Sequence, residues 1–164
     1  MGYGEPLSSS SNLKGRDWID LLARMIYGEA ENQTEEGKRG VAFIAYNRKQ
    51  KNLSEFGGNT WEGVLLKGFD GIRSARALKP DTSSQAWKDS LDIAQNISSK
   101  TNPIGKCLWH NTKEAYNLHI RNAGGPEQYK FSDLYGYRDV VEKKQLEIIS
   151  FLSNWIPSTV TTDV

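Results

Sequence analysis

The feature that most constrains the fold is an apolar stripe over residues 17–31. Its apolar members recur every three or four positions, which is the spacing of one helix face: Trp18, Leu22, Met25 and Ile26. Asp17 is placed to cap the first turn. The same steps lead on to Glu29, so the sequence predicts an amphipathic helix with a carboxylate on its apolar face near the C-terminal end.

Three further segments have helical spacing. Thr34 opens the second helix and is followed by Glu35 and Glu36, which suit the positive end of the helix dipole. A third helix is expected from Ser83 or Ser84 to about residue 97. A fourth is expected over about 141–155, because Leu146, Ile149, Leu152 and Ile156 recur at helical spacing.

The segments 50–80 and 100–138 have weak periodicity and are rich in Gly, Asn, Pro, Ser and aromatic residues. A short helix over 61–66 and a short strand over 107–110 are expected within them. Long irregular segments in a compact domain are usually functional or disordered, and the aromatic content favours function.

Composition narrows the classes of function. The 164 residues suffice for one compact domain. With 21 Lys and Arg against 20 Asp and Glu, the net charge of +1 provides no field that would hold nucleic acid or an anionic membrane. The longest apolar run, residues 41–46, is too short to span a bilayer, and no signal-peptide pattern is expected at the N-terminus. One cysteine, Cys107, excludes an internal disulfide and a thiolate-cage zinc site.

The two ends differ in composition from the rest. Residues 1–15 hold a serine run with Gly and Pro and almost nothing to bury, so we expect a flexible leader there. Residues 158–164 have the same character and are expected to be a flexible tail. The catalytic domain is expected to span 16–157.

Glu29 is the strongest candidate for chemistry. A carboxyl group on an apolar face loses water, and this raises its pKa because the charged form suffers most. The partial negative charge at the helix C-terminus acts in the same direction. A carboxylic acid that stays protonated near neutral pH can serve as the general acid that breaks a glycosidic bond. The alternative is a structural glutamate that bends to solvent or pairs with Arg24 or Arg48.

Three blocks of sequence carry a family resemblance: Leu21–Ala30 (LLARMIYGEA), then Gly37 with Val41-Ala42, then Asn47-Arg48. Together they resemble the opening signature of the spore-cortex-lytic, SleB-type cell wall hydrolases. The similarity continues more weakly through Asn59–Val64, Gly68-Phe69, Ala86-Trp87 and Leu108–Asn111, and covers about 120 residues.

The resemblance implies an α+β, predominantly helical, lysozyme-like domain that acts on peptidoglycan glycan strands. Members of the family resemble lytic transglycosylases, which cleave between N-acetylmuramic acid and N-acetylglucosamine and leave a 1,6-anhydromuramoyl end. Glu29 would then be the sole catalytic acid and base, without metal or cofactor. A monomer outside the cytoplasm is expected, in the cell wall, the spore cortex or on a phage particle. A hydrolytic muramidase of the same fold and a non-catalytic peptidoglycan-binding module remain as alternatives.

Six residues are predicted to contact the substrate, because sugar rings stack on aromatic faces and amides bind N-acetyl groups. They are Phe69, Asp70, Trp109, Asn111, Tyr135 and Tyr137. Asp70 and Asp139 are also candidates for a second carboxylate, although each is more readily explained as a solvated loop acid.

Two patterns depart from the family or point elsewhere. The family's closing Gly-x-His-x-aromatic motif is here Gly136–Val140, with Tyr137 where histidine is expected. His110 and His119 lack a third ligand at metal-binding spacing, so a zinc site is not expected.

Overall fold

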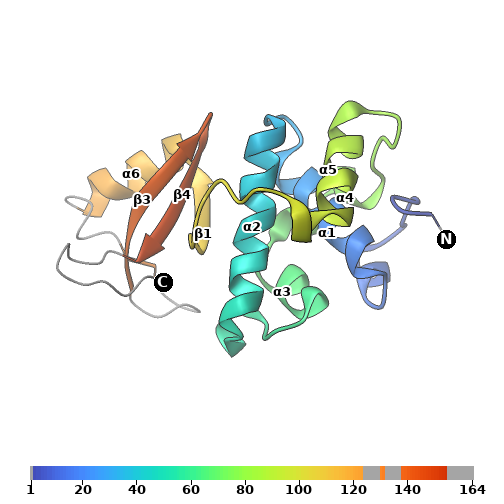
Figure 1. Cartoon of the computed structure of the whole chain (residues 1–164), viewed down its shortest axis with the longest axis horizontal. Coiled ribbons are helices and arrows are strands. Elements are labelled where there is room, and N and C mark those ends of the chain that lie inside the picture. Colours follow the sequence, from blue (N-terminus) through green and yellow to red (C-terminus); the bar gives the residue numbers. More distant parts are fainter. Residues whose placement is uncertain (1, 124–129, 132–137, 155–164) are drawn as a thin grey trace. The chain divides into compact units, whose positions relative to one another are not determined.

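The computed structural model describes residues 2–123, 130–131 and 138–154, and the chain divides into two compact units. The first unit, Met1–Pro103, is helical, and the second, Ile104–Val164, contains a helix and a small antiparallel sheet (Figure 1). This composition confirms the predicted α+β, predominantly helical fold class. The predicted domain boundaries stay a prediction, and the proposed tail over 158–164 lies outside the described residues.

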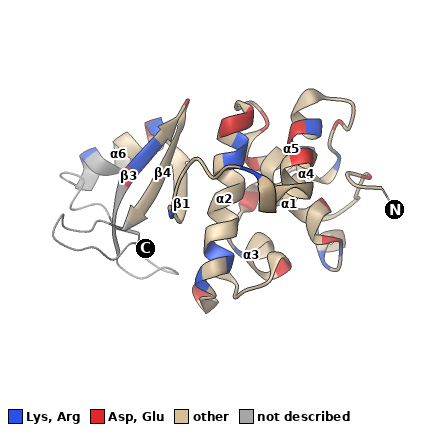
Figure 2. Ribbon diagram, viewed as in Figure 1, with Lys and Arg blue, Asp and Glu red and all other residues tan. Residues whose placement is uncertain are grey.

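Helices of the first unit begin where the sequence places capping side chains. Asp17 accepts a hydrogen bond from the Ile19 N–H at 2.8 Å, and Thr34 accepts one from the Gly37 N–H at 3.1 Å. The acidic first turn and basic last turn of the second helix complement its dipole (Figure 2). The helices are α1 (Trp18–Ala30), α2 (Glu35–Lys51), α3 (Trp61–Gly68), α4 (Ala75–Leu78) and α5 (Gln85–Gln95). Four 3₁₀ turns accompany them: η1 (Ser10–Leu13), η2 (Ser54–Phe56), η3 (Asp70–Arg73) and η4 (Ile97–Ser99).

The predicted helices that begin at Asp17, Thr34, Thr60 and Ser84 are therefore confirmed. Helix α1 lies at the centre of the unit and packs against α2, α3, α4, α5 and η3. Its side chains from Asp20 to Gly28 are all buried. Burying a large aliphatic side chain contributes about 1.5–3 kcal/mol, so the stripe read from the sequence anchors this unit.

The N-terminal segment packs on this core, which differs from the sequence prediction. Leu7 and Leu13 are buried, and the Leu7 N–H donates to the Leu78 carbonyl at 2.9 Å. The Gly4 N–H donates to Asp20 Oδ1 at 2.7 Å. The expectation that residues 1–15 have almost nothing to bury was wrong, because two leucines among the serines suffice to dock the segment.

A buried ion-pair cluster joins this segment to α1. The Asp20 carboxylate accepts from Arg16 Nε at 2.6 Å and from Arg24 Nε at 2.7 Å. Arg24 is fully buried and also donates to the carbonyls of Glu5, Ala77 and Leu78. Every charge in the cluster is thus paired or hydrogen-bonded, as burial requires.

The second unit is built on a sheet with strand order β1-β4-β3-β2. All neighbouring strands are antiparallel, and Trp109 lies opposite Leu152 in the register of β1 and β4. The elements are β1 (Trp109–Thr112), α6 (Lys113–Ala123), β2 (Lys130–Phe131), β3 (Arg138–Leu146) and β4 (Ile149–Asn154). The predicted short strand exists, two residues further along the chain than expected.

The fourth predicted helix, over about 141–155, was wrong, because this segment forms the β3–β4 hairpin. The residues from Ile149 to Ser153 are all buried, so these five positions of β4 do not alternate between buried and exposed. A strand buried on both faces shows no period of two and cannot be told from a helix by spacing. Glu147 adopts φ +51° in the turn, where a helix would have continued.

Candidate active site

Glu29 lies in the last turn of α1 and is partly buried. Its Oε2 accepts a hydrogen bond of 2.6 Å from the backbone N–H of Gly71, which belongs to η3. An N–H donated to a carboxylate is a charge-assisted hydrogen bond, and it fixes the direction of the group as well as stabilising the anion. The carboxylate is therefore oriented by a backbone atom that lies 42 positions away in the sequence.

The backbones of α1 and η3 cross at a pair of glycines, Gly28 and Gly71. A Cβ atom on Gly28 would lie 2.6 Å from the carbonyl carbon of Gly71 and closer still to its oxygen. A Cβ atom on Gly71 would lie 2.9 Å from both Glu29 Cδ and the carbonyl carbon of Gly28. Only two glycines allow this approach, and the approach brings the Gly71 N–H within reach of Glu29.

Side chains on both sides of the crossing hold it in place. Ser74 Oγ donates to the Gly71 carbonyl at 2.6 Å. Arg76 donates to the Gly28 carbonyl through Nε at 3.1 Å and Nη2 at 2.5 Å. The carbonyl oxygens of Gly28 and Gly71 therefore both accept hydrogen bonds from side chains. These bonds hold the two backbones in place, with the Gly71 N–H directed at the Glu29 carboxylate.

Arg24 and Arg48 are the two arginines considered as partners for Glu29, and their contacts include the following. Arg24 pairs with Asp20, at the opposite end of α1. The guanidinium of Arg48 lies over the rings of Phe56 and Phe69, at 5.1 and 4.9 Å from their centres. Since Phe69 immediately precedes η3, Arg48 supports the segment that carries Gly71.

The predicted substrate-binding residues fall in both units of the chain. Asp70 is exposed and lies next to Gly71, so it is in the neighbourhood of Glu29. Phe69 also precedes Gly71, but it is only 1% exposed, and the Arg48 guanidinium covers one face of its ring. A sugar cannot stack on a ring without an exposed face, so Phe69 serves the site through packing and not as the predicted sugar contact.

The remaining predicted contacts belong to the second unit or to the part of the chain not described. Trp109 and Asn111 lie on the same face of β1, two positions apart. Trp109 is 1% exposed, which again differs from the prediction of a ring open to sugar, whereas Asn111 is partly exposed. Tyr135 and Tyr137 lie outside the described residues.

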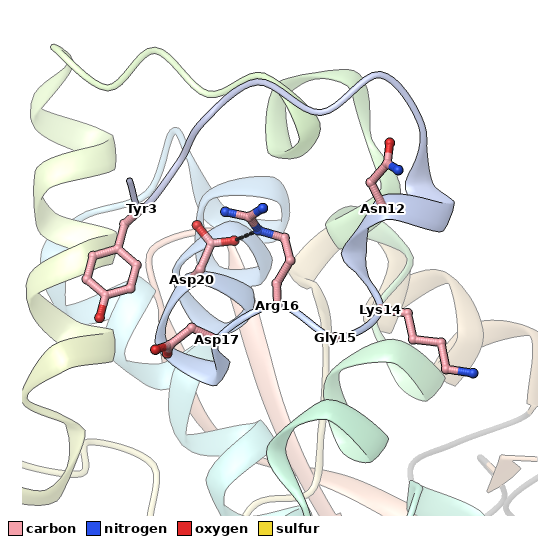
Figure 3. Close-up of a pocket in the computed structure, with 7 residues that line it drawn as sticks. All are labelled: Tyr3, Asn12, Lys14, Gly15, Arg16, Asp17 and Asp20. Atoms are coloured by element: carbon pink, nitrogen blue, oxygen red, sulfur yellow. Dashed lines mark hydrogen bonds and ion pairs between the residues drawn. The ribbon is translucent and has the colours of Figure 1, made fainter. Parts of the chain in front are cut away.

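A pocket of about 380 Å³ lies near the N-terminal end of α1, at the end opposite Glu29 (Figure 3). Its polar lining includes Asp17, Arg16 and Asp20. Burial acts to lower the pKa of Arg16, but hydrogen bonds with Asp20 and Glu5 outweigh it and raise that pKa. The Arg16–Asp20 pair drawn in Figure 3 thus holds the docked N-terminal segment.

Two further properties bear on function. Among the described residues, no cluster of His, Cys, Asp and Glu side chains is suited to hold a metal ion. No helix in the described part of the chain is long and apolar enough to cross a membrane.

The sequence pattern predicts Glu29 as the candidate carboxylate but gives no indication that the Gly71 N–H donates to it. The only signal was the glycine-flanked loop around Asp70. A backbone donor leaves no side-chain signature, and its role follows from the crossing with Gly28.

Comparison with known proteins adds a fold assignment. No protein-family model matches the chain, and no curated protein matches it. The structure is similar to the catalytic domain of the germination-specific lytic transglycosylase SleB from Bacillus anthracis, with a TM-score of 0.53 at 20% identity over 85% of this chain and 98% of that one. It is also similar to the catalytic domain of Bacillus cereus SleB, with a TM-score of 0.53 at 21% identity over 93% and 98%. The chain therefore has a SleB-type, lysozyme-like fold.

Proposed function

We propose that this protein cleaves the glycan strands of peptidoglycan as a lytic transglycosylase, with Glu29 as its acid and base. The observation that carries the proposal is the hydrogen bond of 2.6 Å from the Gly71 N–H to Glu29 Oε2, within a SleB-type fold. The similar Bacillus anthracis domain is described as a germination-specific lytic transglycosylase. A site of action outside the cytoplasm follows from this substrate.

The proposed reaction needs one carboxyl group. Protonated Glu29 gives its proton to the glycosidic oxygen between N-acetylmuramic acid and N-acetylglucosamine as that bond breaks. The resulting carboxylate takes the proton of the C6 hydroxyl of the muramoyl residue, whose oxygen attacks C1. A 1,6-anhydro ring closes and Glu29 is protonated again, so no water is consumed.

The Gly71 N–H supports the second half of this cycle. It stabilises the carboxylate form and keeps the group from rotating away between the two proton transfers. Preorganised backbone donors act in this way because they need no rearrangement during the reaction. The exposure of Asp70 beside Gly71 supports its proposed role as a supporting contact with the substrate.

Mass spectrometry of the muropeptides released from purified peptidoglycan tests the proposal. The wild type is expected to release anhydro products, one water lighter than hydrolysed muropeptides, and Glu29→Gln to release none. Glu36→Gln is the matched control, because Glu36 is exposed in the first turn of the neighbouring helix α2. The control should retain activity close to that of the wild type.

Other outcomes identify the alternatives. Hydrated products that disappear with Glu29→Gln would indicate a muramidase of the same fold, with Asp70 as the next residue to test. Binding without any release, from vegetative and from cortex peptidoglycan, would indicate a non-catalytic binding module. Equal release by wild type and Glu29→Gln would refute the assignment of Glu29.

A further inference from the structure

Three aromatic side chains from three helices of the first unit form a cluster that the site around Glu29 does not use. The rings of Trp18 in α1 and Trp61 in α3 are stacked, with centres 5.4 Å apart and planes within 9°. Tyr46 of α2 lies 6.4 Å from Trp61. We call Trp18, Trp61 and Tyr46 the aromatic platform.

The platform is open to solvent. Trp18 is 38% exposed, although it belongs to the apolar stripe of a helix in which Asp20–Gly28 are buried, and Trp61 and Tyr46 are partly exposed. A parallel stack covers one face of Trp18 and leaves surface on the other side. The exposed indole is therefore a large apolar surface on a rigid helix that remains unburied in the folded protein.

Polar groups surround the rings. Lys49 Nζ lies 5.7 Å from the centre of the Trp61 ring, and Asn59 and Thr60 immediately before Trp61 are exposed. A flat aromatic surface with hydrogen-bonding groups at its edge suits a sugar, which has apolar C–H faces and equatorial hydroxyls.

The platform is aligned with Glu29. Trp18 and Glu29 are 11 positions apart in α1, so their Cβ atoms point in directions about 20° apart and lie about 16 Å apart along the axis. Leu22 and Met25 fill the stripe between them and are fully buried. In the neighbouring segment, α3 starts at Trp61 and the chain then reaches Gly71, the donor to Glu29. Both segments therefore connect the platform to the region of Glu29 through the core of the unit, with the platform and the carboxylate at opposite ends of α1.

We propose that the aromatic platform is a distal binding region for the glycan strand, on which sugars stack about 16 Å from the bond that is cut. This inference rests on the proposed function for the identity of the ligand. Its consequence is a dependence on length: long strands reach both Glu29 and the platform, and short fragments reach Glu29 alone.

Binding of peptide-free glycan strands tests the proposal, with long strands and short fragments prepared from the same peptidoglycan. All proteins carry Glu29→Gln, so that no strand is cut during the measurement. Trp18→Ala is expected to weaken binding of long strands by about 5- to 10-fold, within the range of about 2- to 12-fold for loss of one aromatic contact. Binding of short fragments should change by less than about twofold.

Tyr3→Ala is the matched control, because Tyr3 is 37% exposed and lies beside Gly4, which packs on Trp87 of α5 and not on α3. It should bind both substrates as the parent does. Circular dichroism checks folding, and if Trp18→Ala is unfolded, Trp18→Gln is measured in its place. The long glutamine side chain can still cover Trp61 without offering a ring to sugar.

Three results would overturn the proposal for the platform. The first is unchanged binding of long strands by the Trp18 variant, and the second is an equal loss of binding affinity for long and short substrates. The third is an oligomeric state of the parent protein that changes when Trp18 is replaced. The last would assign the surface to a second copy of the chain. Cleavage is scored separately with the wild-type protein. Loss of long-strand binding in the Trp18 variant without any cleavage by the wild type would retain the platform and refute the proposed reaction.

Discussion

Replacing Gly71 with alanine tests whether the backbone crossing positions Glu29, the proposed catalytic carboxylate. The new Cβ atom would lie 2.9 Å from Glu29 Cδ and from the carbonyl carbon of Gly28, and closer still to Glu29 Oε2. Ordinary carbon contacts begin at about 3.4 Å, so η3 and α1 must separate or the carboxylate must turn aside. Either response breaks or lengthens the hydrogen bond from the Gly71 N–H.

The expected losses of rate and stability follow from this displacement of the carboxylate. Moving a catalytic group by about 1 Å costs on the order of 100-fold in rate, which is about 2.7 kcal/mol of activation free energy. Overpacking of this kind also lowers the free energy of unfolding by about 1–3 kcal/mol. We therefore expect Gly71→Ala to lower kcat by about 100-fold while most of the protein remains folded.

The assay is release of muropeptides at a temperature where urea unfolding shows each variant to be folded. Gly4→Ala is the control for lost stability, because its Cβ would lie 2.6 Å from Trp87 and its φ of +78° adds strain, at the other end of α1. It should lower stability and leave kcat near that of the wild type. A Gly71→Ala protein with the kcat of the wild type would refute the positioning role of the crossing.

The remaining predictions concern stability. Asp20→Asn should lower the free energy of unfolding by about 3–5 kcal/mol in urea titrations, because the buried Arg24 loses its counterion. Arg48→Met should lower it by about 1–2 kcal/mol by removing a cation that contacts the rings of Phe56 and Phe69, and an unchanged urea midpoint would contradict this. Hydrogen bonds from the side chain and backbone of Ser83 lower the pKa of Asp81 below 3.8. The stabilising contribution of ionised Asp81 is present above the pKa of this carboxyl group in the unfolded chain and is lost as pH falls through its pKa in the folded protein. Asp81→Asn should therefore reduce the acid-induced loss of stability. Unfolding measured at a series of acidic pH values checks this prediction.

The sequence by itself determined the helical part of the first unit. The starts of α1, α2, α3 and α5 follow from capping side chains and apolar spacing, because both signals act between residues one turn apart. For the same reason the sequence placed Glu29 near the end of α1. The family signature around Glu29 predicted the SleB-type fold that the structural comparison supports.

Only the tertiary structure decided which side chains are available at the surface. Phe69 and Trp109 were predicted to meet sugar and are buried, whereas Trp18 was assigned to the apolar stripe and is 38% exposed. Spacing along one element shows which residues share a face. It does not show how much of that face its neighbours cover.

The hairpin and the glycine crossing also required the tertiary structure. The β3–β4 segment has apolar residues at positions that fit a helix or a strand buried on both faces, and pairing with β1 selects the strand. The contact between Gly71 and Glu29 joins residues 42 positions apart through a backbone N–H that every residue except proline possesses. Local sequence therefore predicts the helix that carries the carboxylate, while the long-range packing of two glycines determines the direction in which it points.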